Sequence, residues 1–247
     1  MCVFYAGKHD RPPIVFAIKR IEVTEKLITP TVVSDSYEVS ITVDCAVFGF
    51  HEGVLKVLLV KRSIAPYKDH WLLPGGIMEK DQTLEEAVNQ VLYHLTGMSD
   101  IHQEQVKIYS KVDRHPAKRV VTVCFYALVK PENHPVIAKN HISEVAWFPI
   151  NEPLPSLAFD HATLFSDAHE TLKQNLKRRL LFGELLADAF TLKELQDLYE
   201  SILNEQLDRR NFRKKMMQLD LLEATGEKKI GVRGGPELYR IKKQSRS

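Results

Sequence analysis

The chain has 247 residues, of which 44% are hydrophobic and 27% are charged, so it can form one or two folded domains and is neither disordered nor fibrous. No apolar run approaches the ~18 residues that a membrane span needs. No signal peptide is recognisable either, and the sequence therefore predicts a cytoplasmic protein with no membrane partner. Three cysteines, Cys2, Cys45 and Cys124, do not form a disulfide framework or a CxxC pair, so we expect no zinc site and no other cofactor.

Charge is unevenly distributed along the chain. The net charge is +2, but residues 207–247 carry 12 Lys and Arg against 5 Asp and Glu, a local charge of +7 that leaves −5 for the rest. A basic C-terminal module on an acidic body indicates a polyanion-binding appendage. A solvated basic tail has the same composition and is the alternative.

The first folded region is expected to follow a poorly defined N-terminal extension, residues 1–38, to which no function is assigned. Residues 39–47 alternate between apolar and polar side chains, and an apolar run at 54–62 follows a short turn, so the two predict a β-hairpin. Residues 120–129 and 145–148 predict two more strands because they are rich in β-branched and aromatic side chains. We take this region to be one domain, residues 39–158.

One buried helix is expected between these strands. Apolar residues recur with helical spacing from Leu84 to Leu95. Thr83 and Glu86 form a capping box at its start, and Gly97 is placed to end it. The order of strands, one helix and further strands predicts an α+β sandwich rather than a doubly wound parallel sheet.

A helical region over residues 159–187 is expected to link this domain to a C-terminal one. Its apolar residues repeat every four positions, which fits one helix or two. The repeating residues are Leu164, Ala168, Leu172 and Leu176.

The C-terminal domain, residues 188–247, has the element order of a winged helix-turn-helix. A capping box of Thr191 and Glu194 starts one helix, and a second is expected from Asp208 to about Leu219. Two short apolar stretches around a glycine-rich loop then predict a β-hairpin. The hairpin strands are residues 221–224 and 237–241.

The second of these helices separates its side chains by type. On a helical wheel Phe212, Met216 and Leu219 share one face, which we expect to be buried, and the opposite face is rich in Arg and Lys. Such a face fits the DNA major groove, where Arg reads guanine and Asn reads adenine. With the basic residues of the hairpin loop, the candidate DNA-contacting residues are Arg209, Arg210, Asn211, Arg213, Lys214, Lys215, Lys228, Lys229 and Arg233.

A glycine-rich loop, Leu73-Pro74-Gly75-Gly76, precedes the predicted helix of the first domain. Gly76 and Gly97 stand 21 residues apart, with the aliphatic Leu92 between them. These features and Trp71 resemble the Nudix family, whose signature is G-x5-E-x7-R-E-U-x-E-E-x-G-U, where U is aliphatic. The resemblance implies a Nudix-like α/β/α sandwich.

The acidic residues of that signature are missing. Its first Glu and its Arg fall on Gln82 and Gln90, and its three metal-binding Glu positions fall on Val91, His94 and Leu95. Family hydrolases need those carboxylates to hold Mg²⁺. We therefore expect no catalytic residues, no metal site and no enzyme activity. The alternative is a Nudix-type pyrophosphohydrolase that acts on nucleotide-diphosphate sugars with unusual metal ligands.

A binding pocket can remain after catalysis is lost. Nudix domains bind phosphorylated nucleosides or sugars, Arg suits phosphate groups, and an aromatic ring can stack on a sugar or base. The candidate effector-binding residues are Arg62, Trp71, Asp113, Arg114 and Arg119.

A degenerate Nudix-like domain joined to a basic winged helix resembles the Nudix-related transcriptional regulators of the NrtR/AraR-like group. The strings Phe159-Asp160-His161 and Asp208-Arg209-Arg210-Asn211-Phe212-Arg213-Lys214 carry this resemblance. It implies a homodimer that binds a palindromic double-stranded DNA operator and responds to a small-molecule effector, a pentose or an ADP-ribose-like nucleotide. The missing carboxylates favour a sugar or sugar-derived effector. An RNA or protein adaptor with the same basic module is a further alternative.

Overall fold

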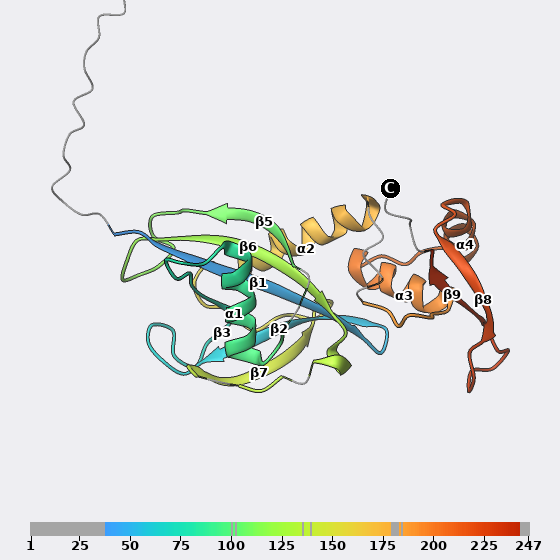
Figure 1. The fold of residues 1–247 in the computed structure, drawn as a ribbon, viewed down its shortest axis with the longest axis horizontal. Coiled ribbons are helices and arrows are strands. Elements are labelled where there is room, and N and C mark those ends of the chain that lie inside the picture. Colours follow the sequence, from blue (N-terminus) through green and yellow to red (C-terminus); the bar gives the residue numbers. More distant parts are fainter. Residues whose placement is uncertain are drawn as a thin grey trace, which may run out of the picture. The chain divides into compact units, whose positions relative to one another are not determined.

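The computed structural model describes residues 38–242, except residues 100, 102, 135, 139, 179–182 and 184 and the side chains of residues 177 and 178. The N-terminal extension predicted for residues 1–38 therefore lies outside the described residues, apart from its last one. Residues 40–178 fold around a mixed sheet, and residues 192–241 form two helices and a hairpin (Figure 1). No helix in these described ranges is long and apolar enough to cross a membrane.

Seven strands form the sheet within the described residues. They are β1 (Ser40–His51), β2 (Val54–Arg62), β3 (Trp71–Leu72), β4 (Gly75–Ile77), β5 (Gln103–Tyr109), β6 (Val120–Val129) and β7 (Ile142–Pro149). The central order is β3-β2-β1-β6-β5, while β4 pairs with β1 and β7 pairs with β2. The β1–β6 pair is parallel and the other pairs are antiparallel. This is the predicted α+β class.

Most of the predicted strands are confirmed. β1 and β2 form the expected hairpin, and β6 matches residues 120–129. The strand expected at residues 145–148 lies in the C-terminal half of the longer β7. Sequence patterning missed β5, because it is an edge strand whose residues are half-buried or exposed, so that even Ile108 is 58% exposed. A short 3-10 helix, η1 (Pro131–Asn133), follows β6.

The predicted buried helix is α1 (Leu84–Thr96), and its caps are as expected. The Thr83 hydroxyl accepts a hydrogen bond from the Glu86 N–H at 3.2 Å, and the Glu86 carboxylate accepts one from the Thr83 N–H at 2.8 Å. Gly97 ends the helix with φ +83°, a left-handed conformation that glycine adopts without steric cost.

Helices cover both faces of the sheet, as a sandwich requires. Alternate residues of β1 point to opposite faces. One set, with Val43 and Val47, packs against buried α1 residues such as Leu92. The other set, with Phe48, packs against α2 (His161–Arg178) on the far side. The protein thus has the α/β/α layering that the sequence predicts.

The helix predicted to be a linker is also a layer of the sandwich. α2 is one continuous helix up to Arg178, and its four-residue apolar repeat is buried in the same core as β1 and β6. The buried residues are Leu164, Ala168, Leu172 and Leu176. α2 is therefore part of the core of the sandwich and not only a connection between domains.

The C-terminal elements follow the predicted winged-helix order. They are α3 (Leu192–Leu203), α4 (Arg209–Gln218), β8 (Leu222–Lys228) and β9 (Glu237–Ile241). β8 extends through residues 226–228, which the sequence placed in the loop. The prediction that Leu219 is buried was wrong, since it is 45% exposed. α4 ends at Gln218, and the buried side chain after it is Leu222 of β8.

The winged helix packs directly against the sandwich. The Leu55 N–H of β2 donates a hydrogen bond to the Ser201 Oγ of α3 at 2.7 Å. His169 Nε2 of α2 lies 2.9 Å from the Ile202 carbonyl of α3 and donates to it. Buried side chains of both regions belong to one apolar cluster, so no solvent layer separates the two cores.

Candidate functional site

A buried arginine of the sandwich domain, Arg114, contacts two carboxylates. The Arg114 side chain is only 5% exposed. Its Nε and Nη2 donate hydrogen bonds to the two carboxylate oxygens of Asp160 at 3.0 and 2.9 Å, and its Nη2 lies 3.7 Å from Asp44 Oδ2. Thr122 donates a further hydrogen bond to Asp44 Oδ2 at 2.7 Å. This bidentate geometry fixes the plane of the guanidinium group.

Backbone geometry makes room for this cluster. Asp44 of β1 pairs with Gly75 of β4 in the ladder. A Cβ atom at Gly75 would lie 1.8 Å from Asp44 Oδ1, so any other residue there would displace the carboxylate. Gly75 of the glycine-rich loop found in the sequence therefore leaves the space that the Asp44 carboxylate occupies.

His161, the first residue of α2, is the next member of the cluster and lies beside Asp44. The Leu73 N–H donates a hydrogen bond to its Nδ1 at 3.1 Å, and its Nε2 lies 3.7 Å from Asp44 Oδ1. Burial lowers the pKa of His161, although Asp44 and Asp160 act in the opposite direction. The ring is therefore neutral at pH 7, with its proton on Nε2.

Asp44, Arg114 and His161 of this cluster line a cavity of about 200 Å³, here named the Arg114 cavity. Its polar and aromatic lining includes Arg62, Arg114, His115, Lys118, Phe159 and His161. Phe159 stacks on His115 with ring centroids 5.3 Å apart. Three cations and a pair of stacked rings suit a ligand that carries both anionic and flat groups.

The structure brings two of the five predicted effector residues into this cavity, Arg62 and Arg114. Arg62 also donates to the carbonyls of Ile64 and Pro66 at 3.0 and 2.8 Å, so it holds the loop after β2. Burial lowers the pKa of Arg62. It thus both shapes and lines the cavity.

The other three predicted effector residues lie outside the cavity lining. Trp71 packs edge-on against Phe148, with centroids 4.9 Å apart, and is a packing residue. Asp113 is exposed and pairs with Lys111 at 3.3 Å, and Arg119 Nη1 donates to the Lys111 carbonyl at 3.0 Å. Both therefore stabilise the loop before β6.

Sequence reasoning missed several residues that line or support the cavity. The string Phe159-Asp160-His161 carried the family resemblance, but no pattern assigned it to a pocket. Lys118 and His115 sit in a loop without regular periodicity. Only the fold places Asp160, 46 residues along the chain, against Arg114.

A second cavity, of about 540 Å³, lies beside α1 and is here named the α1 cavity. Its lining includes Gly76, Ile77, Gln90, Val91, His94 and Leu95. The three positions that carry metal-binding Glu in the Nudix signature therefore face a cavity, but two of the three are apolar. Within the described residues no group of three or more His, Cys, Asp or Glu could hold a metal ion. These donors do not fit a Mg²⁺ site.

The exposed face of α4 is the second candidate site. The Asp208 carboxylate caps the helix by accepting from the Asn211 N–H at 2.8 Å. Phe212 and Met216 are buried, with Phe212 edge-on to Tyr199 of α3 at 5.3 Å. The remaining side chains before Gln218 are exposed, including the predicted contacts Arg209, Arg210, Asn211, Arg213, Lys214 and Lys215. No ion pair with a described residue holds the cations of this set.

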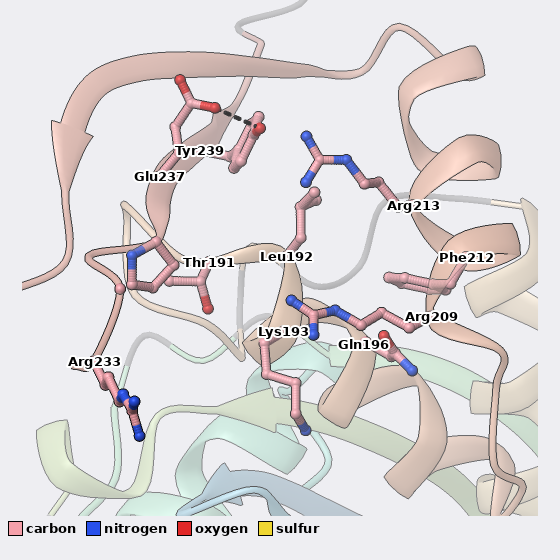
Figure 2. Close-up of a pocket in the computed structure, with 12 residues that line it drawn as sticks. Thr191, Leu192, Lys193, Gln196, Arg209, Phe212, Arg213, Arg233, Glu237 and Tyr239 are labelled. Carbon is pink, nitrogen blue, oxygen red and sulfur yellow. Dashed lines mark hydrogen bonds between the residues drawn. The ribbon is translucent and has the colours of Figure 1, made fainter.

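A basic cleft of about 350 Å³ lies between α4, the N-terminal turn of α3 and the β8–β9 hairpin. Figure 2 shows Arg209 and Arg213 extending from α4 into the cleft, with Lys193 of α3 below them. Arg233 lines the cleft from the hairpin loop, on the side away from α4. The sequence did not single out Lys193. The other basic residues of the cleft come from α4 and the hairpin loop, which only the fold brings close to it.

The hairpin lysines differ in their surroundings. Lys229 forms an ion pair with Glu194 of α3. Burial raises the pKa of Glu194, but hydrogen bonds from Lys229 and Thr191 outweigh it and lower that pKa. Lys228 is exposed and has no ion pair with a described residue. Lys229 therefore ties the hairpin to α3, while Lys228 is available to a partner.

Comparison with known proteins identifies both folded regions of the chain. Residues 40–168 match the NUDIX domain, and residues 182–241 match the NrtR DNA-binding winged helix domain. The ADPR responsive transcriptional repressor NtrR of Acinetobacter baylyi is 34% identical over 203 residues, 81% of each chain.

The solved structures that are similar to this chain include two of the same relative. The crystal structure of Shewanella oneidensis NrtR complexed with a 27mer DNA is 36% identical, with a TM-score of 0.69 over 82% of this chain and 93% of that one. The NUDIX domain of the same protein, in a cocrystal with ADP ribose, is 34% identical, with a TM-score of 0.51 over 55% of this chain and 89% of that one.

A Nudix-type sandwich joined to a DNA-binding winged helix defines a transcriptional regulator with an effector-binding domain. The chain belongs to the NrtR family of these Nudix-related regulators.

Proposed function

We propose that this protein regulates transcription by binding operator DNA through α4 and the β8–β9 hairpin, and that a nucleotide of the ADP-ribose type changes its affinity for that DNA. The observation that carries the proposal is the position of Arg114. Its guanidinium lines a cavity and at the same time forms a bidentate pair with Asp160, the residue before α2. An anion in the cavity competes directly with Asp160 for Arg114.

The path from the cavity to the DNA-binding helix is short and continuous. Asp160 directly precedes α2, which starts at His161. His169 of α2 donates to the Ile202 carbonyl of α3, and Tyr199 of α3 packs against Phe212 of α4. A ligand shifts operator affinity only by its different affinity for the two states of the protein. Displacement of Asp160 from Arg114 supplies such a difference.

The effector class follows from the cavity and from the relatives. The sequence alone favoured a sugar, but three cations in the Arg114 cavity suit a diphosphate better than a neutral pentose. ADP-ribose carries such a diphosphate between two ribose rings, and it is the ligand named for the A. baylyi and S. oneidensis proteins.

The protein is proposed to act as a homodimer on a palindrome, with its two α4 helices one DNA turn, ~34 Å, or a multiple of it apart. The test is a random-duplex selection with the purified full chain, repeated with ADP-ribose and with L-arabinose. Enrichment of a palindrome whose recovery changes with ADP-ribose alone is the expected result. Absence of enrichment at low salt contradicts DNA recognition, and an effect of L-arabinose alone contradicts the effector.

Loss of hydrolysis is part of the same proposal, because the α1 cavity lacks the carboxylates that hold Mg²⁺ in family enzymes. Incubation of ADP-ribose with the protein and Mg²⁺ is expected to release no AMP or ribose 5-phosphate. Release of both in a steady turnover supports the pyrophosphohydrolase alternative instead.

A further inference from the structure

The tip of the β8–β9 hairpin carries an unusually exposed apolar side chain. Ile230 is 95% exposed, more than any other large hydrophobic residue that the structure describes, and Val232 is 47% exposed. Neither belongs to an apolar cluster of the described residues. Single exposed apolar residues are common on soluble proteins, so the exposure alone assigns no role to Ile230. Its surroundings in the loop decide what it can contact.

The loop that holds Ile230 is closed by backbone hydrogen bonds on both sides of it. The Lys229 N–H donates to the Pro236 carbonyl at 2.9 Å, and the Gly235 N–H donates to the Val232 carbonyl at 3.1 Å. Figure 1 shows this loop projecting at the end of the hairpin. The fold therefore holds Ile230 at a projecting tip rather than in a packed position.

The residues next to Ile230 suit a polyanion with a narrow groove. Residues 228–235 contain three cations and three glycines and no carboxylate. Gly231, directly after Ile230, has φ +78°, and a Cβ atom there would meet nothing within 4 Å, so the backbone can approach another molecule closely. The minor groove of DNA is about 6 Å wide and attracts Lys and Arg through its negative potential. A thin, basic loop of this kind fits that groove.

The basic cleft places this loop opposite α4. Arg209 and Arg213 of α4 line the cleft from one side, and Arg233 and Gly234 line it from the hairpin loop (Figure 2). A phosphate backbone that lies in this cleft separates the two grooves of a duplex. With α4 in the major groove on one side of that backbone, the hairpin tip meets the minor groove on the other.

We propose that Ile230 is an apolar wedge that enters the minor groove beside the α4 contacts, inserts between two base pairs and bends the operator. Ile, Leu, Phe and Met side chains act in this way in proteins that kink DNA from the minor groove. Removal of the Ile230 side chain from water offsets part of the cost of unstacking the bases.

The wedge adds sequence preference without a hydrogen bond to a base. Pyrimidine–purine steps such as TA unstack and kink most easily, so Ile230 selects such a step at a fixed distance from the bases that α4 contacts. This inference rests on the proposed function, since it describes how the same protein deforms its operator.

The test uses the full chain and the duplex enriched by the random-duplex selection. One form of the duplex carries a dye at each end, so that a bend raises the energy transfer between them. A second form carries 2-aminopurine at the pyrimidine–purine step enriched beside the half-site, and its fluorescence rises when the step unstacks.

The variants are Ile230→Ser, the conservative Ile230→Leu and the control Ile137→Ser. Ile137 is 64% exposed in the sandwich domain, so its variant removes a similar apolar side chain away from the hairpin. Thermal unfolding checks that each variant is folded.

The wild type is expected to raise both the energy transfer and the 2-aminopurine fluorescence when it binds, and Ile230→Leu and Ile137→Ser are expected to do the same. Ile230→Ser is expected to lose both signals and to weaken operator binding by about tenfold, because it no longer stabilises the bent duplex. Its salt slope stays that of the wild type, since no cation is removed.

Two results overturn the wedge and leave the regulator intact: a duplex that stays straight and stacked in the wild-type complex, or equal bending by Ile230→Ser and the wild type. Failure of the wild type to bind any selected duplex refutes DNA recognition in the proposed function, and this inference with it.

Discussion

The two candidate sites treat charge in opposite ways. In the sandwich the decisive cation, Arg114, is buried and held by Asp160 and Asp44. On α4 the cations are exposed and have no ion pair with a described residue. A buried, paired arginine responds to a competing anion of small size, whereas exposed cations collect the phosphates of a polymer. Under the proposed function, the chain therefore separates effector sensing from DNA binding by burial.

The largest effect is expected from breaking the buried pair. Arg114→Ala leaves Asp44 and Asp160 without their cation, and such an uncompensated buried charge costs about 3–5 kcal/mol of the free energy of unfolding. Denaturant unfolding with an unchanged m-value measures this loss. Lys111→Ala is the control, because its exposed pair with Asp113 is expected to contribute within about 0.5 kcal/mol. Similar midpoints for the two variants contradict a structural role for the Arg114 pair.

The next effect tests the exposed side of the comparison. Arg210→Ala and Lys214→Ala are each expected to weaken operator binding by ~1–3 kcal/mol if they touch bases, with the free energy of unfolding unchanged. Fluorescence anisotropy with the selected operator measures both. Lys80→Ala, an exposed charge on the sandwich, is the matched control and should bind as wild type does. Wild-type affinity in both α4 variants shows that another face of the helix meets DNA.

Two neighbouring lysines of the hairpin, one paired and one exposed, allow the same comparison at adjacent positions. Lys229→Ala removes a half-exposed ion pair with Glu194 and is expected to cost roughly 0.5–1 kcal/mol of stability. Lys228→Ala is expected to leave stability unchanged and to reduce the salt slope of DNA binding by about 1. Thermal unfolding and affinity measured over a salt series separate the two. An exchange of these phenotypes contradicts the assigned roles.

The smallest effect at neutral pH comes from His161, because it is already uncharged there. Burial lowers the pKa of His161 in the folded chain, so the unfolded chain binds more protons below about pH 6.5. The free energy of unfolding is therefore expected to fall as the pH drops below about 6.5 and to level off below the folded-state pKa. In His161→Gln, whose amide oxygen can still accept from Leu73, this pH dependence becomes shallower. An unchanged slope contradicts the neutral buried ring.

Local patterns predicted most of the fold. Residues that are close together in the sequence determine the capping boxes at Thr83 and Thr191 and the alternation of β1. Each of these features was found as expected. The edge strand β5 was missed because exposed strands carry weak patterning. Leu219 was misplaced because a helical wheel does not say where the helix ends.

The two candidate sites also differ in how far the sequence could predict them. The exposed face of α4 follows from helical spacing alone, and the residues that the sequence placed on it are exposed. The Arg114 cavity depends on Asp44, Arg114 and Asp160, which lie far apart along the chain and meet only in the fold. Composition could not tell the cavity residue Arg62 from the packing residue Trp71, because burial and direction decide between them.

The most direct test of the account is operator affinity measured with and without ADP-ribose on the same full-length protein. Coupling between the Arg114 cavity and α4 predicts that saturating ADP-ribose changes the operator Kd by about 5-fold to 150-fold. An unchanged Kd, with ADP-ribose shown to be bound by calorimetry, contradicts the claim that the cavity and the DNA-binding helix are linked.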